Sequence, residues 1–362
     1  MKFHKKVKFY RFICLMLCMF MLSFTFSSYT LGADETLDGW KEETVSYDKV
    51  VTFEDGGKDY IYWIDGVENH YFVPPKGFKP VDASDEMLLR YCFPVRPKDK
   101  DSEDYAEWLK LMSNYVGTPE PEIVVVKKPA MGAINAHATN ASSYNWSGYL
   151  SNLGSYSSNF YTQVQMSYTQ PTISSIKPNV INHNLYWVGL GGYNFNRLVQ
   201  AGTSTQGLST HRAWYEYLSS IGSEVCMQFL SLPVSAGDNI YVYISFQRAN
   251  DLFNYYIANN TTGQSVSGTV TLAASTQFDG TTAEWVVERC TENDGYAALS
   301  KYGTATFTNC KATLNTSNTW INLNSLTGLT ALKMINNSGL TLSQPGSITS
   351  NHRFNCTWHH YN

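Results

Sequence analysis

The stretch Thr282–Arg289, with the sequence TAEWVVER, decides the fold of its part of the chain. Val, Trp and Thr favour strands, and successive side chains of a strand point to opposite faces. The alternation therefore puts Glu284 and Glu288 on one face and the apolar Trp285 and Val287 on the other. Two carboxylates on one face of an apolar strand are costly to bury without partners. We expect them to be paired structurally or to take part in acid–base chemistry.

Short strands of this kind are predicted throughout the chain from Asn145 onward. Turns rich in Asn, Gly and Thr separate alternating runs at residues 160–168, 240–246, 255–258 and 266–272. Many short strands with frequent turn signals indicate an all-β fold, an antiparallel β-sandwich or barrel. Another run, residues 213–217 (AWYEY), puts Trp214 and Glu216 on a common face, which predicts a polar cleft on a sheet.

Six segments in a fixed order carry a resemblance to a known family. They are residues 145–149 (NWSGY), 187–192 (WVGLGG), 198–202 (LVQAG), 213–216 (AWYE), 237–240 (GDNI) and 282–288 (TAEWVVE). In this order they resemble the glutamic peptidases, the eqolisin family G1 of secreted, acid-acting endopeptidases. The resemblance covers residues 145–310 and implies a β-sandwich of two bent sheets, in a bacterial-type preproenzyme that needs no metal or cofactor.

The resemblance assigns a catalytic pair. Gln200 matches the residue whose amide stabilises an oxyanion, and Glu288 matches the general base. A glutamate carboxylate ordinarily titrates near pH 4.3, which suits a base that works in acid. From the residues alone, Gln200 is an ordinary strand amide, and Glu288 could instead form an ion pair with Arg212, Arg197 or Arg353.

Other residues of the motifs lie outside the catalytic pair. Glu284 belongs to the motif but lies outside the catalytic pair of the family, and alternation alone does not separate it from Glu288. Trp187, Trp214 and Glu216 match positions that line the substrate cleft, although Trp214 would serve equally well in a core.

The chain departs from the fungal family pattern at two positions. Gly191 and Ser204 stand where fungal members tend to have acidic residues. The cleft therefore has less negative charge, which leaves the catalytic pair intact. The pH optimum and the subsite preference of the fungal members are not carried over to this chain.

A glycan-active sandwich is the alternative, either a lectin-like module or a two-carboxylate glycoside hydrolase. Glu216 and Glu288 would then be the acid and base, and Trp187 and Trp214 the sugar platforms. This alternative gives Gln200 no function.

The first part of the chain is predicted to serve export and maturation. Basic residues, an apolar run and small residues within residues 1–32 are typical of a signal peptide, although an uncleaved anchor is the alternative. Residues 33–116, where acidic residues outnumber basic ones, are predicted to be a small α+β pro-segment with a hairpin at residues 60–73 and helices at 84–91 and 101–115. Residues 117–143 are predicted to be a linker and activation region, and residues 144–362 the peptidase domain.

Few charges occur beyond residue 136, and acidic and basic residues balance there. Because acid denaturation acts mainly through carboxylates and ion pairs, this part is expected to tolerate low pH. No basic patch for nucleic acid and no metal-binding spacing of histidines is present. The resemblance implies polypeptide substrates, and we expect a secreted monomer with no membrane partner once the signal peptide is removed. In an oxidising compartment Cys226, Cys290, Cys310 and Cys356 could form disulfides, with Cys310–Cys290 or Cys310–Cys356 the first pairings to test.

Overall fold

The chain folds into two antiparallel sheets packed face to face. The computed structural model describes residues 41–128, 142–154, 158–193, 197–218, 225–272, 278, 280–292, 295–317 and 319–362. The predicted signal peptide, residues 1–32, therefore lies outside the described residues. The described residues all belong to one compact unit, residues 33–362.

The first sheet, called here the β9 sheet, carries the motif segments. From edge to edge it contains β1 (Lys41–Thr44), β5 (Val124–Lys128), β12 (Val225–Leu230), β11 (Thr210–Leu218), β10 (Leu198–Gln206), β9 (His183–Gly191), β16 (Thr282–Arg289), β7 (Trp146–Asn152) and β21 (Leu329–Ile335).

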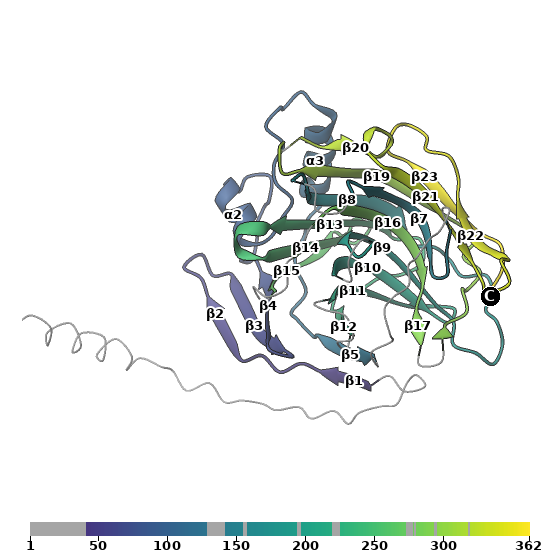
Figure 1. Cartoon of the computed structure of the whole chain (residues 1–362). Coiled ribbons are helices and arrows are strands. Elements are labelled where there is room, and N and C mark those ends of the chain that lie inside the picture. Colours follow the sequence, from purple (N-terminus) through teal and green to yellow (C-terminus); the bar gives the residue numbers. More distant parts are fainter. Residues whose placement is uncertain are drawn as a thin grey trace, which may run out of the picture. The chain divides into compact units, whose positions relative to one another are not determined.

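The second sheet, called here the β13 sheet, lies behind it. In order it contains β2 (Lys49–Thr52), β3 (Lys58–Ile64), β4 (Val67–Val73), β15 (Gln264–Thr271), β14 (Leu252–Asn259), β13 (Asn239–Gln247), β8 (Tyr161–Thr169) and β19 (Thr304–Leu314). Figure 1 shows β13, β8 and β19 as neighbours.

Short strands connect the two sheets and complete the fold. β21 pairs with β7 of the β9 sheet and with β22, which leads through β23 to β19 of the β13 sheet. The bounds are β6 (Ser142–Ser143), β17 (Thr291–Glu292), β18 (Gly295–Tyr296), β20 (Ile321–Asn322), β22 (Thr341–Pro345) and β23 (Phe354–Trp358), with 3₁₀ helices at Arg248–Asn250 and Leu323–Ser325.

The predicted alternation of Thr282–Arg289 is confirmed. Trp285 and Val287 are fully buried in the core between the sheets, and the Trp285 indole N–H donates a 2.8 Å hydrogen bond to the Gln165 carbonyl of the opposite sheet. Val286, on the other face, belongs to a separate apolar cluster with Trp187 and Trp214. The strand therefore presents its two carboxylates on the outer face of the β9 sheet.

The helices cover the outer face of the β13 sheet. Helix α2 (Asp85–Arg90) begins at Ser84, whose side chain accepts the Met87 N–H, and α3 (Glu103–Ser113) is capped in the same way by Ser102. Trp108 and Met112 of α3 pack in a cluster with tyrosines of β13 and β14. Neither described helix is long and apolar enough to cross a bilayer.

The region predicted to be a linker contains regular structure. Residues 124–128 form strand β5, which pairs with both β1 and β12, and residues 142–143 form β6. The apolar run Ile123–Val126 is buried or half-buried, and burial of such residues favours a strand over a solvated linker. Residues 129–141, the middle of the predicted linker, lie outside the described residues.

Candidate active site

Three neighbouring strands bring the motif side chains together on the outer face of the β9 sheet. β9 lies between β10 and β16, so Gln200 on β10 is opposite Gly189, and Glu284 on β16 is opposite the same glycine. Glu288 is opposite Leu185, further along β9. Glu216 on β11 is directly opposite Gln200. The sheet register thus gathers one amide and three carboxylates from three strands, β10, β11 and β16.

Glu288 is a buried carboxylate with two donors. It is 8% exposed, its Oε1 accepts a 2.9 Å hydrogen bond from the Asn145 side-chain amide, and its Oε2 accepts a 2.8 Å hydrogen bond from the Trp187 indole N–H. Hydrogen bonds donated to a carboxylate stabilise its ionised form. Glu288 is therefore held in one orientation, and the two donors offset part of the cost of burying its ionised form. The alternative ion pair with Arg212 is not formed, because Arg212 binds Glu42 at 2.7 Å.

Asn145 was quoted within a motif in the sequence analysis but was given no role there. The Ser143 hydroxyl holds it through bonds to the Asn145 side chain and backbone N–H, 3.2 and 3.3 Å long. Asn145 immediately precedes β7, and the first residue of β7, Trp146, is paired with Glu288. The sequence signal for Asn145 was its place at the start of the motif at residues 145–149, whereas the pairing of β7 with β16 appears only in the structure.

Trp187 reaches Glu288 because its neighbour on the same face is a glycine. A Cβ on Gly189 would lie 2.8 Å from Cζ3 of Trp187, so any side chain there would displace the indole ring. Trp146 packs edge-on against Trp187 with 5.1 Å between ring centroids. The indole is thereby fixed from two sides and its N–H points to Oε2 of Glu288.

Gln200 is held in a similar way. It is 4% exposed, and its Nε2 donates to Oε2 of Glu216, while its Oε1 accepts no hydrogen bond from the described residues. The amide nitrogen has two hydrogens, so one remains available to an oxyanion. The unoccupied Oε1 can accept a hydrogen bond from water.

Glu284 and Trp214 are more deeply buried than Gln200 and Glu288. Both side chains are 0% exposed, and Trp214 packs in the outer-face apolar cluster with Phe229 and Leu218. Trp187 is also 0% exposed. Both tryptophans were predicted to line the substrate cleft, with a place in the core as the alternative for Trp214, and in the intact chain neither ring presents a surface to solvent.

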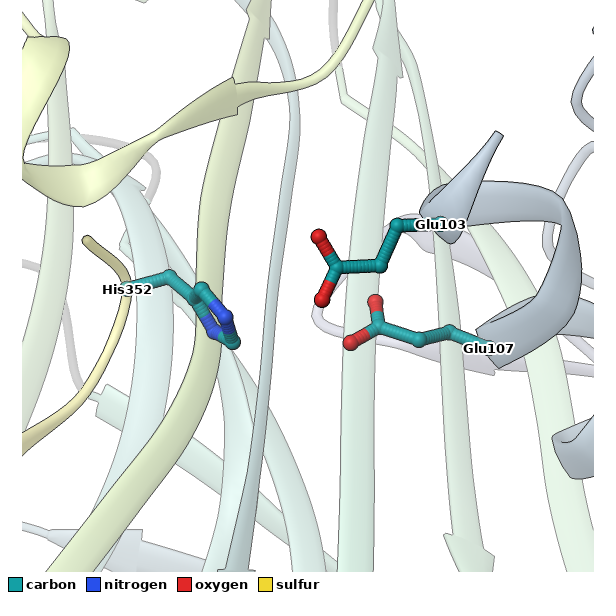
Figure 2. A group of neighbouring side chains, drawn as sticks. All are labelled: Glu103, Glu107 and His352. Atoms are coloured by element: carbon teal, nitrogen blue, oxygen red, sulfur yellow. The ribbon is translucent and has the colours of Figure 1, made fainter. Parts of the chain in front are cut away.

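The arrangement is suited to acid–base hydrolysis. Glu288 can take a proton from water, and Gln200 can donate to the oxygen that becomes negative when that water attacks a carbonyl. Among the described residues, the cluster with metal-type side chains consists of Glu103, Glu107 and His352 (Figure 2), which lies on α3 and the C-terminal part of the chain. None of these three belongs to the face that carries Gln200 and Glu288.

The disulfides predicted for Cys310 are not formed. Cys310 and Cys356 are both fully buried thiols, and burial raises the pKa of each above its ordinary value. Their strands pair so that Ala305, not Cys310, is opposite Cys356. The prediction was wrong because neither the number of cysteines nor an oxidising compartment shows which cysteines lie opposite each other in paired strands. The side chain of Cys226 lies outside the described residues.

Comparison with known proteins identifies relatives of the sandwich. A model of the Peptidase A4 family matches residues 144–358. Aspergillopepsin-2 of Aspergillus niger is 30% identical over 131 residues, which are 35% of this chain and 45% of the relative. The chain thus matches less than half of that relative's length.

Solved structures of two glutamic peptidases resemble the fold. Scytalido-glutamic peptidase with a transition state analog inhibitor is 21% identical, with a TM-score of 0.49, and the match covers 60% of this chain and 98% of that one. Aspergilloglutamic peptidase from Aspergillus niger is 25% identical, with a TM-score of 0.42, and the match covers 49% of this chain and 99% of that one.

Proposed function

The chain belongs to the Peptidase A4 family, and we propose that it is a secreted endopeptidase that hydrolyses polypeptides in acid through Gln200 and Glu288. One observation carries the assignment of the base: Glu288 receives hydrogen bonds from both Asn145 and Trp187 on the face that also carries Gln200. These bonds orient the carboxylate and favour the ionised form that a general base needs.

In the proposed reaction, a water molecule lies between Glu288 and Gln200. Glu288 takes a proton from this water as it attacks the scissile carbonyl carbon. The Gln200 amide donates a hydrogen bond to the carbonyl oxygen as it becomes an oxyanion. Protonated Glu288 then gives its proton to the leaving nitrogen, the C–N bond breaks, and the carboxylate is restored.

Glu216 has a positioning role in this scheme. Its carboxylate accepts from Gln200 Nε2 and so fixes which end of the amide faces the substrate. The same contact weakens the glycan-active alternative, in which Glu216 and Glu288 are the catalytic acid and base. The Glu216 carboxylate accepts a hydrogen bond from the Gln200 amide, and in this position it cannot readily protonate a glycosidic oxygen.

We also propose that the enzyme is exported by residues 1–32 and acts as a monomer, without nucleic-acid or membrane partners. Cleavage within residues 117–143 would convert a latent precursor into the active enzyme. The burial of Gln200 and Glu288, 4% and 8% exposed, supports latency, because a polypeptide substrate cannot reach side chains that are so well covered.

One assay tests the proposed function. The purified protein is incubated at acid pH with a denatured protein and, separately, with polysaccharides, and new amino termini and new reducing ends are counted. New amino termini alone are expected. Reducing ends without new amino termini would overturn the proposal in favour of the glycoside hydrolase. Terminal sequencing of the acid-treated enzyme should place its new amino terminus at about residues 125–145.

A further inference from the structure

The N-terminal segment, defined as residues 41–128, extends both sheets of the sandwich. Strand β5 pairs with β12 at the edge of the β9 sheet, and β4 pairs with β15 at the edge of the β13 sheet. Backbone hydrogen bonds from Val116 to Gly263 (2.8 Å) and from Ser265 to Gly117 (3.1 Å) add a third connection. Without this segment, β12 and β15 would become edge strands, and the backbone groups that now pair with β5 and β4 would lose these partners.

A buried hydrogen-bond network joins the segment to the strand beside Gln200. The Tyr62 hydroxyl lies 3.0 Å from the Tyr215 hydroxyl and donates to Gln228 Oε1 at 2.9 Å. The Tyr215 hydroxyl donates to Asn69 Oδ1 at 2.7 Å, and Gln228 Nε2 donates to the same oxygen at 3.2 Å. Tyr62, Asn69 and Gln228 are 0% exposed and Tyr215 is 1% exposed. Within the sandwich the Tyr215 hydroxyl also lies 2.6 Å from Gln228 Oε1, and across the boundary the Tyr62 hydroxyl and Asn69 Oδ1 contact both of these residues.

The network lies directly behind the candidate site. Tyr215 stands between Trp214 and Glu216 on β11, and its partner on β10 is Ala201, next to Gln200. Tyr62 and Asn69 therefore support the inner face of the strands whose outer face carries Glu216 and Gln200.

The helices of the segment form a second contact, on the β13 sheet. Lys311 of β19 has a side chain 2% exposed and binds Asp104 at 2.7 Å and Glu107 at 2.9 Å, both on α3. Burial lowers the pKa of Lys311, but the two carboxylates outweigh this effect and raise the pKa above its ordinary value. The Ser267 hydroxyl also donates to the Tyr91 carbonyl at 2.7 Å.

The carboxylates of α3 near Lys311 are better suited to an ion pair with Lys311 than to binding a metal ion. Figure 2 shows His352 facing Glu103 and Glu107. His352 Nδ1 accepts the Asn309 backbone N–H at 3.0 Å, so a neutral ring carries its hydrogen on Nε2 and has no lone pair there for a metal. The Lys311 ammonium already binds Glu107. These groups connect α3 to the sandwich by charge.

Acid would weaken only part of this boundary. In the described residues the ion pairs across this boundary are Glu42–Arg212 and Lys311 with Asp104 and Glu107. Partly exposed ion pairs of the Glu42–Arg212 kind contribute little to stability. The phenols and amides of the network carry no charge in acid, and burial raises the pKa of Tyr62 and Tyr215 further above 10. The backbone hydrogen bonds between paired strands are likewise independent of pH between pH 4 and pH 7.

We propose that the N-terminal segment stays bound to the sandwich without a covalent link after the chain is cut between β5 and β6, in neutral solution and in acid. The segment is then a permanent part of the folded protein, in contrast to the removable pro-segment that the sequence predicts, and the activating cleavage proposed within residues 117–143 does not act by releasing residues 41–128. Loss of the Lys311 contacts in acid loosens α3 while the strands β4 and β5 stay paired.

The test cuts the chain with an external protease, so its result does not depend on the proposed activity. A recognition sequence is inserted between β5 and β6 of residues 33–362 carrying Glu288→Gln, which prevents self-cleavage. The cut protein is analysed by size exclusion at pH 7 and pH 4. Both fragments should elute together at both pH values. Separate elution at either pH, without denaturant, would overturn the proposal.

A matched pair of variants tests the network. Tyr62→Phe removes a hydroxyl that bonds across the boundary, whereas Tyr47→Phe removes one that bonds within the segment, to the Pro121 carbonyl. Tyr62→Phe should weaken association of the fragments by about fivefold or more, the factor for one lost buried hydrogen bond. Tyr47→Phe should leave association unchanged. Equal association constants for the two variants would overturn the role assigned to the network.

Discussion

The Trp187 indole N–H donates a 2.8 Å hydrogen bond to Oε2 of Glu288, across the boundary between β9 and β16. A tryptophan assigned to the substrate cleft from the sequence therefore holds the proposed catalytic base. Gly189 makes this possible because it leaves room for the indole ring. The relationship separates Glu288 from Glu284, which alternation alone could not do.

Glu288→Gln should abolish hydrolysis while the fold survives. The amide keeps the size of the carboxylate but cannot accept a proton from water. The substitution also replaces one of the two carboxylate oxygens that accept from Asn145 and Trp187 by an NH₂ group, which cannot accept. One buried hydrogen bond is therefore lost, and the free energy of unfolding should fall by about 1–3 kcal/mol. Initial rates on a denatured protein at acid pH, with circular dichroism as the check on folding, measure both effects. Near-normal turnover by the folded variant would refute the mechanism.

Glu284→Gln is the control for this variant. It removes a carboxylate from the same strand and the same face, opposite Gly189. If Glu288 is the base, the substitution should change stability more than turnover. Loss of turnover in Glu284→Gln, with Glu288→Gln still active, would move the base to Glu284.

Gln200→Ala should lower kcat by at least about a hundredfold to a thousandfold, the usual cost of one oxyanion donor. The loss should be greater here, because the amide would also position the attacking water. Gln206→Ala is a suitable control, since Gln206 ends the same strand and points to the same face. Comparable kcat values for the two variants would exclude Gln200 from the chemistry.

Trp187→Phe should move the acidic limb of the kcat/KM profile to higher pH. The ring is retained, but the carboxylate of Glu288 loses an N–H donor that stabilises its ionised form. Trp285→Phe removes an indole hydrogen bond on the opposite face of the sheet and should reduce stability without moving this limb. An unchanged profile in folded Trp187→Phe would show that the contact does not tune the base.

His70→Gln should reduce stability more in mild acid than in alkali. His70 lies 3.0 Å from both Asp59 and Glu68. Burial lowers the pKa of His70, but these carboxylates outweigh it and raise the pKa above 6.5. The resulting stabilisation is fully present below pH 6.5, while the carboxylates stay ionised, and is lost as pH rises through the raised pKa. Thermal unfolding at pH 5.5 and pH 9 measures it. An equal loss at both pH values would contradict the prediction.

Local features of the chain were predicted well from the sequence. The hairpin predicted at residues 60–73 forms between β3 and β4, and the helix predicted at residues 84–91 is present as α2, which Ser84 caps. Capping and turn formation depend on residues a few positions apart, so the local sequence contains the information. The same holds for the two faces of Thr282–Arg289.

Contacts between distant residues were not predictable in this way. Asn145 binds Glu288, 143 positions later, and Tyr62 meets Tyr215, 153 positions later. Strand β5 was taken for a linker because its partner, β12, lies about a hundred residues further along the chain. The disulfides of Cys310 were predicted wrongly for the same reason, because the pairing of distant strands decides which cysteines meet.

The sequence by itself determined which side chains share a face, because a strand repeats every two residues and each position therefore has only two choices. It also determined the family, through motifs whose order is preserved. Only the tertiary structure decided which strands are neighbours, and hence that Trp187 and Asn145 hold Glu288, that Glu216 holds Gln200, and that the N-terminal segment completes both sheets. Strand order and register depend on the packing of the whole sandwich, and no local stretch of sequence contains that information.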